Sequence, residues 1–208
     1  MNKPSQRVVA VEREKSRSPA GASVLTQPLP RWAKWLLGVL AVVIALVVLP
    51  NVASLHVYEK HFRGNAPQVR LRFDELSSTM DEAAVRAHFQ GQAPLTCIPE
   101  TQSTLGNRVC YTALRKANGE PALTMALFLR DGRLRHGVLH VPWWAHGAVQ
   151  AGFTRDYGQP RPSGVDESGK RLVRWTMAGG KLEMNDSRYF GPLNHSTAFW
   201  TAEAPLRP

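Results

Sequence analysis

Three histidines close together in the sequence are the side chains best suited to acid–base or metal chemistry: His136, His140 and His146. On a helix, His136 and His140 would share one face and could bind a metal ion. The segment that holds them has the pattern of a strand, where positions four apart lie about 13 Å from each other. We therefore predict no metal and no cofactor, and expect His136 and His140 at solvent-facing strand positions.

The most distinctive local sequence is segment 140–147, HVPWWAHG, which contains two adjacent tryptophans. Trp143 and Trp144 must point to different sides of the element that holds them. In one interpretation, both are buried where two halves of a domain meet. In the other, one ring stays partly exposed as a rigid, amphipathic contact for a partner. The second interpretation predicts a binding site made of Trp143, Trp144, His140 and His146.

Other catalytic motifs are missing from the sequence. It contains no G-x-S-x-G elbow, no S-x-x-K pair, no HExxH, no G-x-G-x-x-G after a strand and no Walker loop. We therefore predict no catalytic residues and no nucleotide partner. We also predict no nucleic-acid partner, because the basic residues are spread singly rather than gathered in one patch. A competing hypothesis is an envelope hydrolase or wall-polymer-binding enzyme, in which folding brings His140, His146 and a carboxylate together.

The chain has only two cysteines, Cys97 and Cys110. An even pair on the exported side of a membrane favours a disulfide. Two cysteines are too few for a zinc site, which needs four ligands at closer spacings. We predict a Cys97–Cys110 disulfide that stabilises the fold by about 3 kcal/mol.

The segment that decides where these residues are located is Trp35–Leu49, which carries no charged side chain. With its flanks it predicts a transmembrane helix over residues 32–55, long enough to cross a bilayer with some tilt. Trp32 and Trp35 beside Arg31 and Lys34 are typical of an interfacial anchor. A buried core helix is the alternative, although such a helix usually carries a polar stripe.

Charge gives the orientation of this predicted span. Residues 1–34 carry seven Lys and Arg against two Glu, whereas residues 50–59 carry no Lys or Arg. The positive-inside rule therefore places a disordered basic tail, residues 1–31, in the cytoplasm, and places residues 56–208 outside it. In the alternative, the apolar segment is a signal peptide cleaved after Val52-Ala53-Ser54. The membrane lipid is a predicted partner when the segment stays in place.

The exported part is expected to hold a stalk, residues 56–68, and one α+β domain, residues 69–208, with an antiparallel sheet. Residue alternation, a Thr79/Glu82 capping box and Gly-containing turns predict the elements. The predicted strands are 69–73, 108–115, 122–130, 133–141, 171–177, 181–185 and 196–201, the helices begin at Met80 and Pro142, and the turns are at Asn118-Gly119, Asp131-Gly132 and Gly179-Gly180.

The order of these elements appears twice, which predicts two tandem α-β-β-β units over about 69–141 and 142–201. Trp175 and Trp200 are expected in the core, and strand 122–130, apolar on both faces, is expected near the centre of the sheet. This element order is similar to that of BamE-like and β-lactamase-inhibitor-like envelope modules. Similarity of element order implies nothing about activity.

The function predicted from the sequence is that of a single-pass protein of the bacterial inner membrane. Its periplasmic domain is expected to bind an envelope protein, through strand edges and one exposed tryptophan, rather than to catalyse a reaction. The modest positive charge of the exported part, 19 Lys and Arg against 14 Asp and Glu, favours anionic partners.

Overall fold

A computed structural model describes residues 30–49, 58–59, 61–62, 65–188, 191 and 194–203. The chain divides into two compact units, Met1–Val47 and Val48–Pro208. The predicted basic tail up to residue 29, the cleavage site at Ser54 and most of the predicted stalk lie outside the described residues. Those predictions therefore remain untested.

In the first unit, helix α1 covers Arg31–Val48 and contains most of the apolar segment. Ten of its large apolar side chains are exposed, from Trp32, which is 67% exposed, to Leu46, which is 70% exposed. No helix in the described part of the chain meets the length and hydropathy expected of a membrane span.

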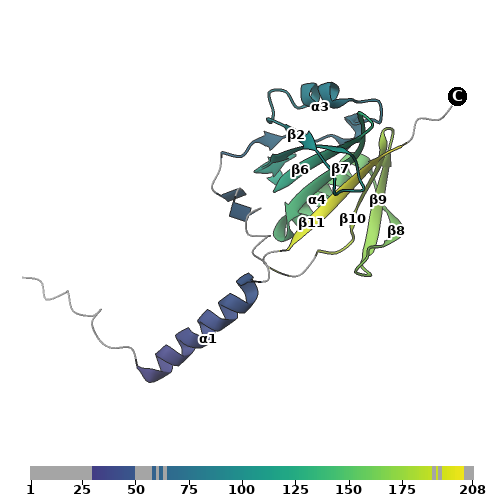
Figure 1. The fold of residues 1–208 in the computed structure, drawn as a ribbon. Coiled ribbons are helices and arrows are strands. Elements are labelled where there is room, and N and C mark those ends of the chain that lie inside the picture. The colour runs from purple at the N-terminus through teal and green to yellow at the C-terminus, as the bar shows by residue number, and fades with distance from the viewer. Residues whose placement is uncertain are drawn as a thin grey trace, which may run out of the picture. The chain divides into compact units, whose positions relative to one another are not determined.

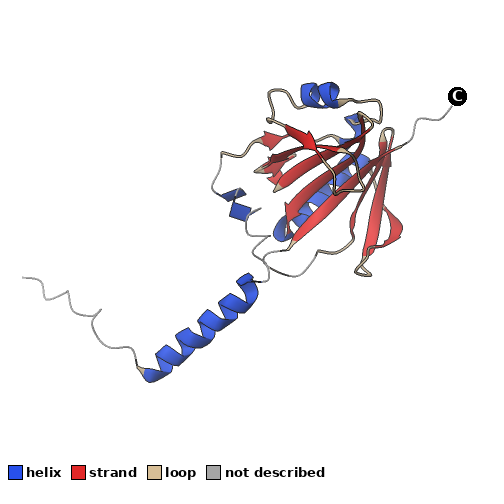
Figure 2. Ribbon diagram, viewed as in Figure 1, coloured by secondary structure: helices blue, strands red, loops and turns tan. Residues whose placement is uncertain are grey.

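The second unit is an α+β domain, as predicted, built on a large antiparallel sheet (Figures 1 and 2). Its elements in chain order are β1 (Gln68–Val69), η3 (Phe73–Glu75), α3 (Glu82–His88), β2 (Thr96–Pro99), β3 (Arg108–Ala113), β4 (Lys116–Ala117), β5 (Glu120–Pro121), β6 (Thr124–Arg130), β7 (Arg133–Pro142), η4 (Trp143–Ala145), α4 (His146–Tyr157), β8 (Arg161–Val165), β9 (Arg171–Met177), β10 (Gly180–Asn185) and β11 (His195–Ala202).

Eight of these strands form one sheet in the order β2-β3-β6-β7-β11-β10-β9-β8. Each half of the sheet is an antiparallel meander preceded in the chain by a helix, α3 for β2 to β7 and α4 for β8 to β11. The two meanders meet where β7 pairs with β11 along seven residues. Each half thus has four strands rather than the predicted three, because the short edge strands β2 and β8 give no clear alternation in the sequence.

Both helices pack against the same face of the sheet. One buried cluster contains Val85 and Phe89 at α3 and Val149 and Phe153 of α4. Side chains from β3, β6, β7, β9, β10 and β11 belong to the same cluster. Trp175 and Trp200 are 1% and 0% exposed in this cluster, as predicted. β6 lies between β3 and β7, so its predicted internal position is also confirmed.

The hairpin turns follow the residues that favour them. Asn118 and Asp131 have φ of 53°, and Gly119 and Gly132 follow with φ of 87° and 72°, so both turns have the positive φ pair of a type I′ turn. The third hairpin turns one residue earlier than predicted, because Gly180 already pairs with Met177.

Two local predictions need correction. The N-cap of α3 is Asp81, whose carboxylate accepts a hydrogen bond from the Ala84 amide at 2.9 Å, so Thr79 is not the N-cap. A carboxylate next to the first turn also interacts favourably with the helix dipole. The strand predicted over residues 69–73 pairs only at Gln68 and Val69, although its alternating burial persists: Leu71 is buried and Arg70 is exposed.

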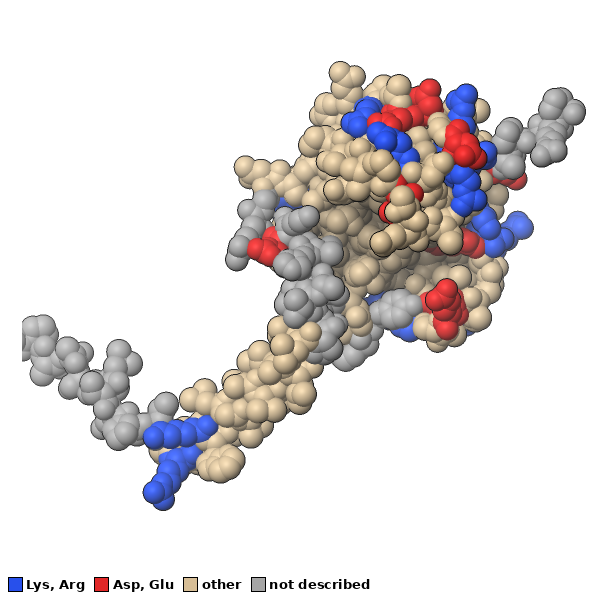
Figure 3. All heavy atoms as spheres, viewed as in Figure 1, with Lys and Arg blue, Asp and Glu red and all other residues tan. Residues whose placement is uncertain are grey.

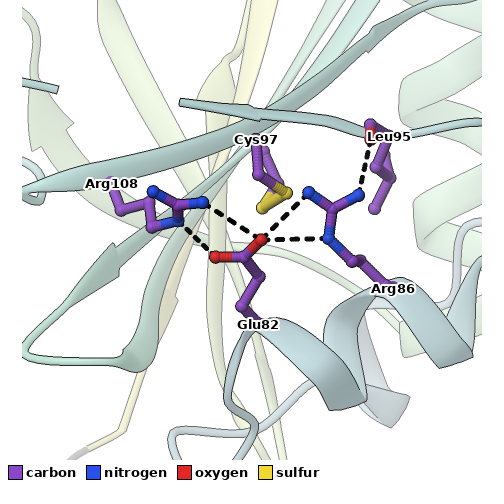
Figure 4. The surroundings of a disulfide bond; sticks show 6 residues. Glu82, Arg86, Leu95, Cys97 and Arg108 are labelled. Carbon is purple, nitrogen blue, oxygen red and sulfur yellow. Dashed lines mark hydrogen bonds and ion pairs between the residues drawn. A yellow bond between two sulfur atoms is a disulfide. The ribbon is translucent and has the colours of Figure 1, made fainter. Parts of the chain in front are cut away.

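The predicted disulfide joins Cys97 of β2 to Cys110 of β3, which are direct cross-strand partners with Cα atoms 3.9 Å apart. Figure 4 shows Glu82 of α3 beside it, between two arginines. Glu82 accepts from Arg108 of β3 and pairs with Arg86 at 2.9 Å, and these interactions, led by the Arg108 hydrogen bond, lower the pKa of Glu82. The disulfide thus joins the edge strand β2 to β3, and the Glu82–Arg108 pair joins α3 to β3.

Candidate functional site

The face of the sheet opposite α3 and α4 is not covered by any described helix. We call it the open face. It is defined by the strand positions that alternate with the buried core positions, and the sheet register places them in rows. One row is Tyr111, Ala126, Val138, Phe199, Glu183 and Arg174; the next is Ile98, Val109, Phe128, His136, Thr201, Lys181 and Thr176.

The part of the open face on β2, β3, β6 and β7 is apolar and aromatic. Ile98 and Tyr111 are 43% and 40% exposed, which is unusual for large apolar residues on a sheet. Phe128 is half-buried beside them. Exposed large apolar side chains gathered on one surface mark contact sites more often than isolated ones do.

A positive field lies over the seam between the two halves. The His136 ring stacks on Phe199 with centroids 5.3 Å apart. Burial lowers the pKa of His136, and the charges of Arg130 and Arg135 lower it further. Arg135 is the extra residue where the β6–β7 register shifts, since Phe128 pairs with His136 but Leu129 pairs with Leu134. The bulge therefore places a guanidinium next to the aromatic stack.

The part of the open face on β10 and β9 is polar. Arg174 donates to Glu183 at 2.7 and 2.9 Å, and Lys181 lies 3.9 Å from the same carboxylate. Burial opposes ionisation of Glu183, but hydrogen bonds from Ser163 and Arg174 outweigh it and lower its pKa. A cavity of about 310 Å³ adjoins this group and is lined by Arg174, Thr176, Gly180, Lys181, Thr201, Ala202 and Glu203.

His140 lies on the open face near the end of β7. Its Nδ1 is 3.2 Å from the Thr197 hydroxyl, and its ring meets that of His195 edge to face with centroids 4.6 Å apart. Burial lowers the pKa of His140 to about 4, and the neighbouring His195 contributes in the same direction. His136 and His140 are therefore less accessible than the solvent-facing positions we expected.

His146 lies on the helical side of the sheet instead. It is 4% exposed, and its Nδ1 is 2.9 Å from the hydroxyl of Ser196, a fully buried residue. Ser196 and Thr197 are consecutive in β11, so their side chains point to opposite faces. The two histidines of the hydrolase hypothesis are thus separated by the sheet, and no shared reacting atom lies between them. Burial also lowers the pKa of His146, although Asp186 acts in the opposite direction.

The tryptophan pair forms a separate site at the end of β7. Trp144 is 44% exposed and Trp143 is half-buried, with centroids 5.9 Å apart, so the interpretation that buries both does not hold. Tyr58 and Phe62 pack against Trp144, at 5.7 and 6.4 Å between centroids. We call Tyr58, Phe62, Trp143 and Trp144 the aromatic cluster.

Tyr58 and His61 hold the segment before the domain against it. Tyr58 is 5% exposed and donates to the Asn194 carbonyl at 2.6 Å. Nδ1 of His61 is 2.8 Å from the Ala122 carbonyl. Sequence reasoning assigned both residues to a stalk. Their spacing, with Phe62 following at once, is a helical i, i+3, i+4 pattern that could have indicated a packed turn.

Metal binding has little basis in the described residues. The one group of three ligand-type side chains found among them is Glu82, Cys97 and Cys110. Both sulfur atoms are in the disulfide and the carboxylate is paired with two arginines, so neither thiolate is available as a ligand.

Comparison with known proteins gives no further assignment: no family model, no curated protein and no solved structure matches this chain.

Proposed function

We propose that this protein is a single-pass protein of the bacterial inner membrane whose periplasmic domain is a non-catalytic module that binds another envelope protein. α1 is the membrane anchor, and the open face is the binding surface. The uncovered, partly apolar open face is the observation that carries the proposal.

The anchor is supported by the surface of α1 and by the distribution of charge. The helix is apolar on all sides from Trp35 onward, and its large side chains are exposed rather than packed in a core. A helix of this kind is stable in water only when something apolar surrounds it. Residues 1–34 carry seven Lys and Arg, whereas residues 50–59 carry none, which favours a cytoplasmic N-terminus.

The binding role is supported by how the open face is built. Exposed Ile98 and Tyr111 offer apolar contact area, and the His136–Phe199 stack continues it toward the seam. Arginine and aromatic side chains on a rigid sheet are the types that contribute most at protein interfaces. The Thr197 hydroxyl lies beside His140 on the open face, but an imidazole whose pKa burial lowers to about 4 is a weak general base, so binding fits these residues better than catalysis does.

Charge indicates what kind of partner this is. Five basic side chains lie on or beside the open face: Arg130, Arg135, Arg161, Arg174 and Lys181. In the two rows described above, the acidic residue is Glu183. Figure 3 shows charged side chains gathered over the end of the domain near α3, with uncharged surface over its middle. We infer a partner that has an apolar contact area bordered by carboxylates.

A photo-crosslinking amino acid at Tyr111 tests the proposal. With the full chain in its native membrane, we expect one discrete adduct from position 111. The same amino acid at Val165, which is 62% exposed on the edge strand β8, is the matched control and should give none. Arg135→Glu should reduce the adduct at 111 about tenfold or more, because it places a carboxylate opposite those of the partner. Equal adducts from 111 and 165, unaffected by Arg135→Glu, would refute the open face as the site.

A further inference from the structure

The aromatic cluster is a second surface, distinct from the open face, and it presents apolar rings outward from a fixed base. Phe62 and Trp144 are 69% and 44% exposed. Tyr58, beneath them, is buried and bonded to Asn194, and Trp143 is covered by the Arg188 guanidinium at 5.5 Å from its ring centroid. The two exposed rings are therefore held in place by side chains that cannot easily move.

The position of the cluster in the chain points to the membrane. α1 ends at Val48, and Tyr58 follows ten residues later. Even a fully extended connection of that length spans no more than about 35 Å. Of the described residues of the domain, Tyr58 is the first in the chain after α1, so this upper limit is tightest for Tyr58 and its packed neighbours.

The sequence also lacks the aromatic belt that usually marks the second end of a membrane span. Trp32 and Trp35 provide one belt, at the basic end. Residues 49–57, LPNVASLHV, contain no Trp, Tyr or Phe, and the first aromatic side chain after the apolar segment is Tyr58. Lys60 and Arg63 flank Phe62 in the sequence, which is the mixture of aromatic and basic residues found at interfaces with anionic lipids.

We propose that Phe62 and Trp144 insert into the outer headgroup region of the bilayer that α1 spans, with anionic lipid headgroups beside Arg188. The folded domain would then supply the second aromatic belt in place of the helix. This inference rests on the proposed membrane anchor. It gives the domain a fixed side toward the lipid and leaves the open face for the protein partner.

The test is quenching of Trp144 fluorescence by lipids. Full-length protein is reconstituted into phosphatidylcholine–phosphatidylglycerol vesicles, with or without bromine on the acyl chains close to the headgroup. The contribution of Trp144 is the fluorescence intensity of the native protein minus that of Trp144→Phe. We expect bromine to lower this difference about twofold, and more strongly than bromine near the chain ends does. Equal emission with and without bromine would overturn the inference.

A second variant checks that the lost emission in Trp144→Phe comes from the aromatic cluster and not from misfolding. Phe62→Trp in that background restores an indole to the exposed side of the cluster, and we expect the restored emission to be quenched to the same extent. Failure of the anchor itself is separable, because Trp32 and Trp35 report on α1. The emission of Trp32 and Trp35 is the part lost in Trp32→Phe and Trp35→Phe. If bromine quenches that part, and the protein floats with the vesicles, α1 is inserted. If bromine quenches the emission of Trp32 and Trp35 but not that of an indole at position 62 or 144, the aromatic cluster does not contact lipid and the proposed anchor stands.

Discussion

The two halves of the domain have the same strand order but are stabilised by different chemistry. In the first half, α3 has seven residues, the disulfide joins the outer strand β2 to β3, and the Glu82–Arg108 pair joins α3 to β3. In the second half, α4 has twelve residues, and Phe153 packs on Trp175 with centroids 5.6 Å apart. The outer strand β8 has no disulfide: a hydrogen bond from Ser163 to Glu183 links it to β10, its burial is low and its register shifts between Pro162 and Gly164.

Both halves are packed and both contain ion pairs, so the difference lies at their outer strands: one is crosslinked by a disulfide and the other is not. The first half has a short helix and needs a crosslink for its edge. The second half packs a longer helix on its strands through large aromatic side chains and leaves its edge exposed. The seam between β7 and β11 belongs to neither half, and the partly buried histidines lie there. Substitutions that affect one half more than the other therefore test the comparison.

The largest effect is expected in the second half, from Trp200→Ala. The indole is fully buried, so its removal leaves a cavity that the neighbouring strands fill only in part. We expect the free energy of unfolding to fall by about 4 kcal/mol. Chemical denaturation measures it, and Tyr111→Ala on the exposed side of the sheet serves as a control with a much smaller change. A loss below about 1 kcal/mol would mean that packing does not hold this half.

The next largest effect is expected in the first half, from Cys97→Ala with Cys110→Ala. Opening this loop should lower the free energy of unfolding by about 3 kcal/mol. Hydrogen exchange gives the sharper measurement: amide protection should decrease at β2 and β3 while β9 and β10 stay protected. A uniform loss of protection across all eight strands would show that the disulfide stabilises the whole sheet rather than one half.

The seam should make stability depend on pH. The pKa of His140 is lowered to about 4 in the folded protein, against about 6.5 when unfolded. The unfolded chain therefore binds the extra proton first, and the contribution of His140 is complete above pH 6.5 and is lost as the pH falls toward 4. We expect a loss on the order of 2–3 kcal/mol over that range.

His140→Asn checks this assignment by removing the titrating ring while keeping a polar partner for Thr197. Its free energy of unfolding should vary less between pH 6.5 and 4 than that of the native protein. An unchanged slope in His140→Asn would assign the effect to other groups.

The smallest effect is expected from Asp81→Ala, which removes the N-cap of α3. The free Ala84 amide should cost about 1 kcal/mol of stability. Thr79→Ala is the matched control, because the sequence favours Thr79 as the cap and the structure does not. A larger loss from Thr79→Ala than from Asp81→Ala would restore the capping box predicted from the sequence.

The sequence by itself determined the local elements. Alternation located β6, β7, β9 and β11, and the Asn118-Gly119 and Asp131-Gly132 pairs located two turns, because these signals depend on neighbouring residues only. It also predicted the disulfide from the number of cysteines. It did not reveal β2 and β8, which are short and lie at the edges, where neither face is buried enough to require alternating apolar residues.

Only the tertiary structure decided what those elements do together. Pairing of β7 with β11 joins residues about 57 positions apart, and it places His140 and His146 on opposite sides of the sheet. Packing of Tyr58 and Phe62 on Trp144 joins residues more than 80 positions apart and leaves Trp144 exposed. Contacts at such separations depend on the pairing of whole strands, and no local pattern of residue types records which partners will meet.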